Sequence, residues 1–472
     1  MTMQVDTAVQ LAADAAREYA ELPLSARSSY LLALAEALDE HEDELVALAA
    51  EETGLTVARL RGELARTSFQ LRLFARVVDD GGLGEQRLEP ADPDFVLGPR
   101  PELRRLLLPI GPVAMFAASN FPFAFSVLGG DTASALAAGC PVIVKAHPGH
   151  PRLSERTFAL ASDYLATAGA PHGILTLVSG EAEGVQLLQH PAVRAASFTG
   201  SVRGGVFLAE IAARRPRPIP FFGELGSVNP VFVGPDAAER PEVAAGYAAS
   251  VGGSAGQLCT KPGFLFAPRD SSLGAAAAAE LRDVPEHRML YPGLGQGYAA
   301  RRADILGAEG VRVLREGTVR EADGHLWVTP TLVSVTVDVL RSAREVLLDE
   351  AFGPLSIVVE YDDPRSLPAL AEEFFEGSLT TTLWTSDAES SAAWIPDLHR
   401  ALLERSGRVI RNGWPTGVAV SPAQQHGGPW PSTTDSQTTS VGTAAVFRFL
   451  RPVTFQNLPL EQLPAEALVV TE

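Results

Sequence analysis

The first part of the chain carries an apolar pattern with helical spacing. Apolar residues recur at helical intervals around residues 31–34 and 45–48, and Ala, Leu, Glu and Arg dominate residues 5–80. This pattern predicts helices, with a break at Thr53-Gly54. The segment that follows, residues 90–101, is rich in Pro and Asp and is typical of a connector.

From Gly111 onward, short apolar runs alternate with helical patterns. A first strand is predicted at 106–109, just before this part of the chain. The strands predicted within it are 113–116, 141–145, 174–178 and 195–199, and the helices are 131–138, 154–168 and 185–189. Alternation of this kind predicts the α/β class, with a parallel sheet that binds ligands at the carboxyl ends of its strands. We expect the alternation to continue to about residue 430, followed by a β-rich segment from Thr439 to Leu450.

Length and charge narrow the class of protein. A chain of 472 residues predicts two or three domains, and a net charge of −19 argues against nucleic acid or an anionic membrane as a partner. No apolar run has the length of a membrane span, and residues 1–10 lack a signal pattern. The only cysteines, Cys140 and Cys259, cannot form a disulfide framework, so we expect a reducing cytoplasm.

Two stretches carry the main candidates for catalysis. Glu224 lies in a Gly-flanked apolar stretch, and Cys259 follows the small residues 252–256. A thiol beside glycines suits attack on a substrate carbonyl, and a nearby carboxylate could activate water. From these flanking residues alone, Cys259 is about as well explained by a buried structural thiol as by a nucleophile. The chain's only lysines, Lys145 and Lys261, lie in stretches of this chemical type.

Three further features point to a phosphate-bearing ligand or an oxyanion. Residues 200–205, with Gly200, Ser201 and Gly205, follow a predicted strand and open a helix, as a phosphate site or a plain turn would. Lys145 ends a strand and could bind a ribose hydroxyl or a phosphate, or lie along the surface. The amide of Asn120 could stabilise an oxyanion or simply form part of a turn.

Two features in the C-terminal half of the chain can also be explained either by ligand binding or catalysis or by a structural role. Glu350 and Phe352 lie just before a Gly-Pro turn, where they could grip a ribose and stack on a heterocycle or pack structurally. His426 in a Gly-rich loop suits acid–base work or a structural role.

Taken in order, these motifs resemble the aldehyde dehydrogenase superfamily. The matching stretches are 120–123, the Lys145 strand, 198–201, 224–230, 256–260 and 350–354. A narrower resemblance, to the branch of α-ketoglutaric semialdehyde (2,5-dioxopentanoate) dehydrogenases and NADP-dependent fatty aldehyde dehydrogenases, rests on residues 145–151, 415–420, 426–429 and 439–445.

The resemblance implies a mechanism. Cys259 would attack the aldehyde, Asn120 and the Cys259 backbone N–H would hold the oxyanion, and Glu224 would activate water to release the acid from a thioester. It further implies that Lys145 and Glu350 hold the riboses, Ser201 the pyrophosphate and Phe352 the nicotinamide side. No metal is expected.

The substrate expected from the branch is a short semialdehyde acid such as 2,5-dioxopentanoate. Its carboxylate needs a cation, for which Arg66 is the first candidate and Arg411 the second, and we place Phe121 and His426 at the same substrate site. A medium- or long-chain fatty aldehyde remains an alternative substrate. Alternatives of other classes are a cofactor-independent cysteine hydrolase or acyltransferase and a non-catalytic scaffold.

The expected cofactor is NADP, with NAD tolerated. In NAD-preferring relatives an acid often lies three residues after the strand lysine, where this chain has Pro148. Residues 145–150 contain no acid, and Arg152 lies close by as a cation for the 2′-phosphate.

The resemblance also predicts the domains. Residues 1–96 and 112–225 would form a Rossmann-like cofactor-binding domain, and 226–438 an α/β catalytic domain. Residues 97–111 and 439–472 would form a small β flap for oligomerisation, giving a homodimer or a homotetramer.

Overall fold

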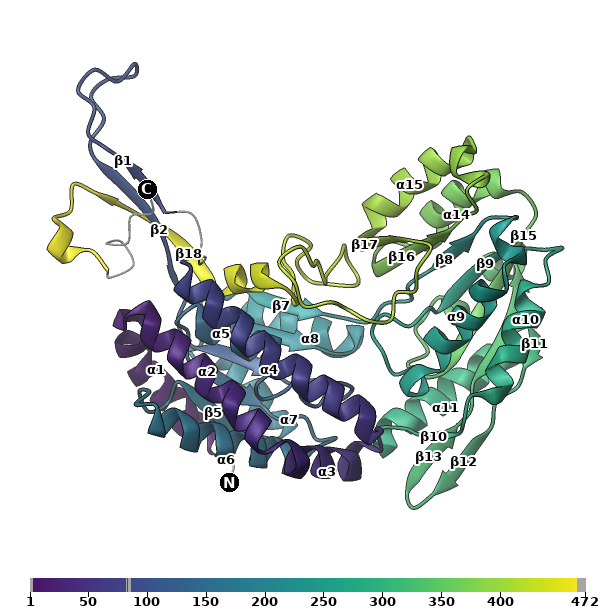
Figure 1. Ribbon diagram of the computed structural model, residues 1–472, viewed down its shortest axis with the longest axis horizontal. Helices are drawn as coiled ribbons and strands as arrows, with labels where there is room; N and C mark the ends of the chain where they lie inside the picture. Colours follow the sequence, from purple (N-terminus) through teal and green to yellow (C-terminus); the bar gives the residue numbers. More distant parts are fainter. Residues whose placement is uncertain (1–2, 82, 84–85, 465–472) are drawn as a thin grey trace.

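The computed structural model in Figure 1 describes residues 3–81, 83 and 86–464. Its N-terminal part is helical, as predicted. The helices are α1 (Val5–Glu21), α2 (Leu24–Glu40), α3 (Glu42–Thr53) and α4 (Val57–Asp79). The expected break is confirmed at Gly54, whose φ of 72° ends α3 and lets its N–H donate to the carbonyl of Ala50.

A five-stranded parallel sheet follows these helices in the chain. Its strands are β3 (Val113–Phe116), β4 (Val142–Lys145), β5 (Leu175–Val178), β6 (Ala195–Thr199) and β7 (Phe221–Glu224), in the order β5-β4-β3-β6-β7. The connecting helices are α5 (Gly130–Ala137), α6 (Pro151–Thr167), α7 (Glu181–Gln189) and α8 (Val202–Arg214). The strand order reverses between β3 and β6, so a ligand site is expected at the carboxyl ends of these two strands.

Alternate side chains of this sheet enter two different cores. Val113 and Val142 pack with residues of α2 to α6, whereas Ala114 and Ile143 pack with residues of α1, α7 and α8. Helices therefore cover both faces, which explains why these strands are apolar throughout rather than alternating.

The second large sheet has seven strands, in the order β11-β14-β15-β9-β8-β16-β17. They are β8 (Val231–Val233), β9 (Phe264–Pro268), β11 (Arg312–Arg315), β14 (Thr331–Thr336), β15 (Leu355–Tyr361), β16 (Ser378–Trp384) and β17 (Ser406–Arg411), and β11 alone pairs antiparallel. Its helices are α9 (Pro241–Gly252), α10 (Leu273–Glu280), α11 (Pro292–Gly307), α12 (Val337–Ser342), α13 (Arg344–Leu347), α14 (Leu367–Phe374) and α15 (Trp394–Arg405). A small sheet of β10 (His287–Arg288), β13 (His325–Val328) and β12 (Val319–Ala322) lies beside α11 (Figure 1).

A separate three-stranded antiparallel sheet projects from the five-stranded part of the molecule (Figure 1). It joins β1 (Arg87–Glu89), β2 (Leu103–Pro109) and β18 (Leu450–Gln456). Strand β1 lies outside the segment 97–111 that we assigned to a flap, and residues 465–472 of the second assigned segment lie outside the described residues. The domain bounds and the oligomerising role stay predictions.

Two sequence expectations about the C-terminal third are wrong. The regular alternation ends at Arg411 rather than near residue 430, and residues 412–442 contain neither a helix nor a named strand. The segment from Thr439 to Leu450 is mainly a 3₁₀ helix, Thr443–Phe449, because Ala445, Val446 and Phe449 all turn into the core. Among the described helices, none is both long and apolar enough to cross a membrane.

Candidate active site

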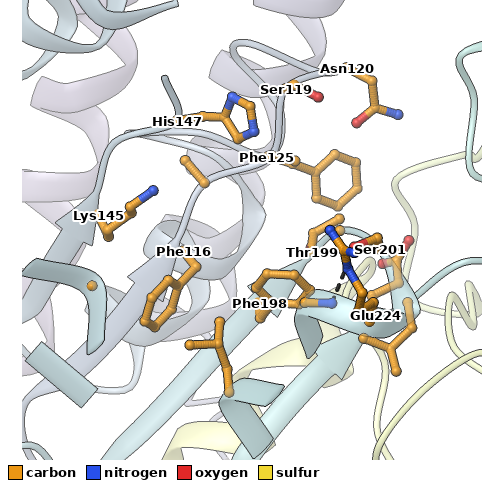
Figure 2. Close-up of a pocket in the computed structure, with 18 of the residues that line it drawn as sticks. Phe116, Ser119, Asn120, Phe125, Lys145, His147, Phe198, Thr199, Ser201 and Glu224 are labelled. Carbon is orange, nitrogen blue, oxygen red and sulfur yellow. Dashed lines mark hydrogen bonds between the residues drawn. The ribbon is translucent and has the colours of Figure 1, made fainter. Parts of the chain in front are cut away.

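A cavity of about 880 Å³ opens at the carboxyl ends of β3, β4, β6 and β7 (Figure 2). It therefore lies where the reversal of strand order places a ligand site. Most residues predicted from the sequence line it: Asn120, Phe121, Lys145, Gly200, Ser201, Glu224, Cys259, Glu350 and Phe352. The structure thus brings the three catalytic candidates and five of the seven cofactor candidates to one cavity, whereas Arg66 and His426 are not among the residues that line it.

The loop that carries Cys259 has an unusual backbone. Ser254, Ala255 and Gly256 have φ values of 53°, 52° and 63°, in the left-handed region. For the two residues with side chains this conformation costs roughly 1–3 kcal/mol each, and such strain is concentrated at functional sites. At Gly256 a Cβ atom would lie 2.4 Å from the carbonyl oxygen of Gly353, so only glycine fits.

Asn229 fixes this loop. Its Nδ2 donates to the carbonyl oxygens of Cys259 (2.8 Å) and Lys261 (3.0 Å), and its Oδ1 accepts from Thr380 of β16. The side chain is 1% exposed. Asn229 lies five residues after Glu224, so one stretch of sequence both supplies a carboxylate and positions the thiol.

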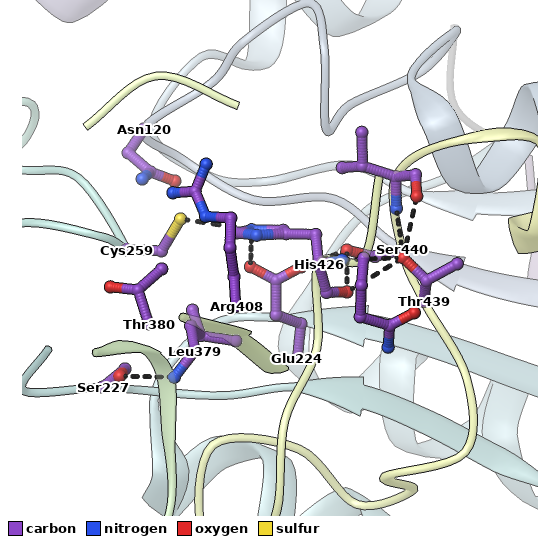
Figure 3. Close-up of polar contacts among 12 residues, drawn as sticks. Asn120, Glu224, Ser227, Cys259, Leu379, Thr380, Arg408, His426, Thr439 and Ser440 are labelled. Carbon is purple, nitrogen blue, oxygen red and sulfur yellow. Dashed lines mark hydrogen bonds and ion pairs between the residues drawn. The ribbon is translucent and has the colours of Figure 1, made fainter. Parts of the chain in front are cut away.

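Cys259, Glu224 and His426 meet at the centre of the site (Figure 3). The Nε2 atom of His426 lies 3.6 Å from the Cys259 Sγ and 2.9 Å from Glu224 Oε1. Glu224 and His426 are both buried, and Ser440 Oγ donates to Glu224 Oε2. Both contacts are made by the same ring nitrogen, and Nδ1 has no hydrogen-bond partner in the described structure, so the imidazole can accept a proton from the thiol only while Nε2 itself carries none.

The electrostatics assign different charge states to these groups. Burial, together with the charges of Glu224 and Glu350, raises the pKa of the Cys259 thiol well above its usual value. Burial alone would raise the pKa of Glu224, but His426 and Ser440 outweigh it and the net pKa is lowered. At neutral pH the thiol is therefore protonated and the carboxylate ionised, so attack by Cys259 needs a base.

Asn120 faces the thiol from the other wall of the site (Figure 3). Its Nδ2 donates to the carbonyl oxygen of Gln257 at 3.1 Å, which uses one of its two N–H groups. The second N–H has no partner among the residues that the structure describes and can donate to an oxygen on the substrate. This geometry fits the oxyanion role that the resemblance implied.

The cofactor side of the cavity fits a dinucleotide. Ser201 caps α8, accepting from the Gly204 N–H at 3.2 Å, so the positive end of a 13-residue helix faces the cavity. Lys145 is half-buried, and burial lowers its pKa although Glu181 and Glu183 oppose this. The Oε1 atom of Glu350 is buried without a hydrogen-bond partner in the described structure, as expected of an acceptor that awaits a ligand hydroxyl.

Two residues predicted to contact the cofactor lie elsewhere. Gly205 is buried and does not line the cavity, because it provides the space in which α8 packs on Leu225: a Cβ there would lie 2.1 Å from Leu225 Cδ2. Arg152 is held away by α3, where its guanidinium forms ion pairs with Glu51 (2.8 Å) and Glu52 (3.4 Å). Its backbone N–H also donates to Glu52.

Lys261, the second lysine, serves structure rather than the cavity. It is 2% exposed, and its Nζ donates to the carbonyl oxygens of Ala351 (3.2 Å) and Leu355 (2.7 Å). Burial lowers the pKa of this amine, while the charge of Glu350 opposes the shift. Lys261 thereby fixes the turn that carries Glu350 and Phe352.

The structure separates the two arginines considered for a substrate carboxylate. Arg66 stacks over the Phe125 ring, 5.6 Å from its centroid, and its buried Nη1 has no hydrogen-bond partner among the described residues. The positive charge of Arg66 lowers the pKa of the Cys259 thiol, although burial raises this pKa by more. Arg411 is exposed and its Nε contacts Thr385 instead.

Sequence reasoning missed two cations. Arg203 lines the cavity and lies inside the motif 200–205, which was examined only for its glycines and serine. Arg408 of β17 lies beside Cys259 and His426 (Figure 3), where its guanidinium donates to the carbonyls of Pro415 and Gly417. Arg408 is recognised only from its place in the fold, because no sequence motif surrounds it.

The three central side chains also form a set of possible metal ligands. One ligand atom from each of Glu224, Cys259 and His426 lies within 4.8 Å of the others. Zinc accepts such ligands. The expectation that the site works without a metal therefore stays a prediction.

Comparison with known proteins agrees with this geometry. Residues 1–279, more than half of the chain, match the family model described as "Aldehyde dehydrogenase family". The alpha-ketoglutaric semialdehyde dehydrogenase 2 of Azospirillum brasilense is 41% identical over 469 residues, covering 98% of this chain and 88% of its own. The alpha-ketoglutaric semialdehyde dehydrogenase of Acinetobacter baylyi is 39% identical over 466 residues, with the same coverage.

Solved structures agree on the fold. The gamma-glutamyl-gamma-aminobutyraldehyde dehydrogenase of Burkholderia cenocepacia superposes with a TM-score of 0.81 at 24% identity, covering 96% of this chain and 88% of its own. Aldehyde dehydrogenase 21 of Physcomitrella patens gives 0.79 at 20% identity, covering 97% and 91%. The chain therefore belongs to the aldehyde dehydrogenase family, and it is an NAD(P)-dependent enzyme that oxidises an aldehyde to a carboxylic acid. The resemblance, fold class and enzyme class predicted from the sequence are confirmed.

Proposed function

We propose that the protein oxidises a short aldehyde bearing a carboxylate, such as 2,5-dioxopentanoate, and prefers NADP or uses it as well as NAD. The observation that carries the substrate proposal is the guanidinium of Arg66. It is held against Phe125, which lines the cavity, and its Nη1 is buried without a partner. A buried, unsatisfied cationic donor is costly, and a substrate carboxylate would satisfy it with a charge-assisted hydrogen bond.

The names of the relatives in Azospirillum and Acinetobacter support the same substrate class. The cavity wall also supplies Phe121 and Phe125, whose rings pack edge to face with centroids 5.5 Å apart. These rings suit a short carbon chain between the reacting aldehyde and the carboxylate.

In the proposed mechanism the first step is proton removal from Cys259. His426 Nε2, 3.6 Å away, accepts the proton as the sulfur bonds to the aldehyde carbon. The carbonyl oxygen becomes an oxyanion, held by the free N–H of Asn120 and the backbone N–H of Cys259. When bound, the nicotinamide supplies the acceptor for the hydride that leaves this adduct, and a thioester on Cys259 remains.

Glu224 acts in the second half of the reaction, in which water releases the acid from the thioester. Its ionised carboxylate lies within 4.8 Å of the Cys259 sulfur, close enough to accept a proton from a water that attacks the thioester carbon. The carbon–sulfur bond then breaks, the sulfur takes back the proton held by His426, and the proton held by Glu224 passes to solvent as the acid leaves. Lys145 and Glu350 would hold the riboses and Ser201 the pyrophosphate, from positions that line the cavity.

The substrate proposal is tested with Arg66→Gln. We expect kcat/KM for 2,5-dioxopentanoate to fall roughly ten- to a hundredfold, because one charge-assisted bond is lost, while kcat/KM for hexanal stays unchanged. Arg72→Gln is the matched control, since Arg72 lies on the same helix but pairs with Asp39 on the surface. An equal loss for both aldehydes would show that Arg66 serves structure and not the carboxylate.

The NADP proposal rests on the cations and acids around the Lys145 end of the cavity. Lys145 and Arg203 line it, and Pro148 stands where an acid often lies in NAD-preferring relatives. Arg203 replaces Arg152 as the second cation in this account. Glu181, which also lines the cavity from α7, is a carboxylate that the sequence reading did not consider. Of the residues that line this end of the cavity, two are cations and one is a carboxylate, while Glu183 acts on Lys145 from outside the lining; this balance still favours a 2′-phosphate.

Pro148→Glu tests this account. A second carboxylate there should repel the 2′-phosphate and accept the free ribose hydroxyls, shifting the kcat/KM ratio toward NAD by roughly ten- to a hundredfold. Pro151→Glu is the control, because Pro151 is exposed at the start of α6 and does not line the cavity. A native enzyme that already prefers NAD strongly, or an unchanged ratio in Pro148→Glu, contradicts the account.

The proposal includes a homodimer or homotetramer in the cytoplasm. Two free cysteines fit a reducing compartment. The projecting sheet of β1, β2 and β18 exposes Leu88, Val96 and Leu97 nearby, which supports a subunit contact there.

A further inference from the structure

A second cavity, of about 410 Å³, lies away from the active site. Four of the residues that line it are arginines: Arg194, Arg215, Arg217 and Arg451. We call it the arginine cavity. Arg194 directly precedes β6, and Arg215 and Arg217 lie between α8 and β7, so the cavity is at the amino ends of these strands. The active site is at their carboxyl ends.

No carboxylate lines the arginine cavity, since its other described lining residues are Ile, Val and Pro. Arg194, Arg217 and Arg451 are exposed, and none of them forms an ion pair with a described residue. By contrast Arg214, next in the chain to Arg215, pairs with Glu210 at 3.2 Å. Acidic residues outnumber basic ones in this chain, 57 to 38. Four arginines that line one cavity without an acidic residue among them are therefore unusual.

Arg215 distinguishes this cavity from a set of solvated surface side chains. It is 8% exposed, and its Nη2 donates to the carbonyl oxygens of His190 (2.7 Å) and Val193 (3.1 Å). Its Nη1 is buried with no hydrogen-bond partner in the described structure. Burial, followed by the charge of Arg194, lowers the pKa of this guanidinium. A buried cation with an unsatisfied donor is costly unless an anion completes it.

We propose that the arginine cavity binds a small anion with at least two negative charges, either a phosphate ester or a polycarboxylate. Guanidinium groups bind both types of oxyanion through paired N–H donors. The volume of 410 Å³ falls within the usual range of metabolite sites, which is roughly 300–1,000 Å³. The length of α8 and β6 separates this site from the cofactor cavity, so the anion does not compete with the cofactor.

The test is isothermal titration of the full-length protein with pyrophosphate and, separately, with citrate, at constant ionic strength. Saturating NADP is present so that pyrophosphate cannot occupy the cofactor site. We expect one binding site per chain for at least one probe, and the tighter probe identifies a phosphate or a polycarboxylate ligand. Arg217→Gln should weaken this binding roughly ten- to a hundredfold, whereas Arg214→Gln should not change it.

Arg217 and Arg214 are both exposed, so these variants should fold alike. Absence of binding for both probes overturns the proposal, as does binding that survives Arg217→Gln. Sedimentation of Arg217→Gln and Arg451→Gln adds a separate check. If either variant loses subunits, the arginines serve a contact with a second copy of the chain and the proposal is wrong; an unchanged assembly supports it.

Discussion

Cys259→Ala is expected to lower kcat for aldehyde oxidation roughly 10⁴-fold or more, because the variant has no atom that can form the thioester. The affinity for NADP should stay nearly the same. Cys259 enters the cavity from the loop after α9, whereas the cofactor candidates Lys145 and Ser201 lie on β4 and at the start of α8. The measurements are steady-state turnover and a cofactor titration.

Cys140→Ala is the control. Cys140 is fully buried, its Sγ lies 3.4 Å from the carbonyl oxygen of Phe449, and burial raises its pKa to about 11. It is therefore a core thiol, and its loss should cost some stability but leave kcat intact. Substantial turnover in Cys259→Ala, or loss of turnover in Cys140→Ala, would reverse the assignment.

Glu224→Gln is expected to separate the two halves of the reaction. The amide cannot accept a proton from water, so thioester hydrolysis should slow by roughly 10²–10⁴-fold. Attack by the thiol should be spared, because the Glu224 charge raises the pKa of Cys259 and its removal makes the thiol more acidic. Rapid mixing should therefore show a burst of reduced cofactor near one per active site, followed by a slow steady state.

The absence of a burst in Glu224→Gln would indicate a second role for Glu224. The Nε2 of His426 lies 2.9 Å from Glu224 Oε1, so the Glu224 charge can also stabilise the imidazole once Nε2 has taken the proton from the thiol. If Glu224→Gln slows the first turnover as much as the later ones, that stabilising role dominates. The proposed division of labour, with His426 for the thiol and Glu224 for water, would then be wrong.

The sequence predicted those features that depend on local pattern. The helices α1 to α4 follow from apolar periodicity, because each is covered on one face, and the strands β3 to β6 follow from continuous apolar runs, because each is covered on both faces. The flanks of Cys259 and Glu224 and the turn at Asn120 made these residues candidates, and the resemblance of the ordered motifs to a known family assigned their roles. Their convergence on one cavity follows from the parallel sheet, whose carboxyl ends lie together.

Long-range pairing could not be predicted. His426 is 167 residues from Cys259, and only the irregular segment after β17 brings its ring to the thiol. Arg152 looked like a cofactor contact because it is close to Lys145 in sequence, but Glu51 and Glu52 of α3 hold it outside the cavity. Gly205 fits a phosphate motif, yet its small size serves the packing of α8 on Leu225.

The wrong predictions for the C-terminal third also result from contacts between segments that are distant in the sequence. Residues 412–442 form no regular structure, because isolated backbone hydrogen bonds and side-chain contacts hold them in place of a continuous row of strand hydrogen bonds. For example, the N–H of Leu225 donates to the carbonyl of Ser432, and the N–H of Thr434 donates to that of Gly223. Apolar residues in such a segment recur without a fixed period, so neither a strand nor a helix pattern describes them.

A thiol with an imidazole 3.6 Å away is a feature of cysteine hydrolases too, the alternative raised by the sequence, but here the carboxylate contacts the same Nε2 atom as the thiol and not Nδ1. Membership of the aldehyde dehydrogenase family decides between the two, and the cavity beside Lys145, Ser201 and Glu350 supplies the place for the cofactor.

The central claim is that this site couples a semialdehyde acid to NADP. The most direct measurement is the initial rate of cofactor reduction by the native enzyme, followed by absorbance with 2,5-dioxopentanoate, hexanal and dodecanal, each with NADP and with NAD. The account predicts the highest kcat/KM for 2,5-dioxopentanoate, a value with NADP at least equal to that with NAD, and one acid formed per cofactor reduced. A higher kcat/KM for dodecanal, or acid formed without cofactor reduction, would contradict it.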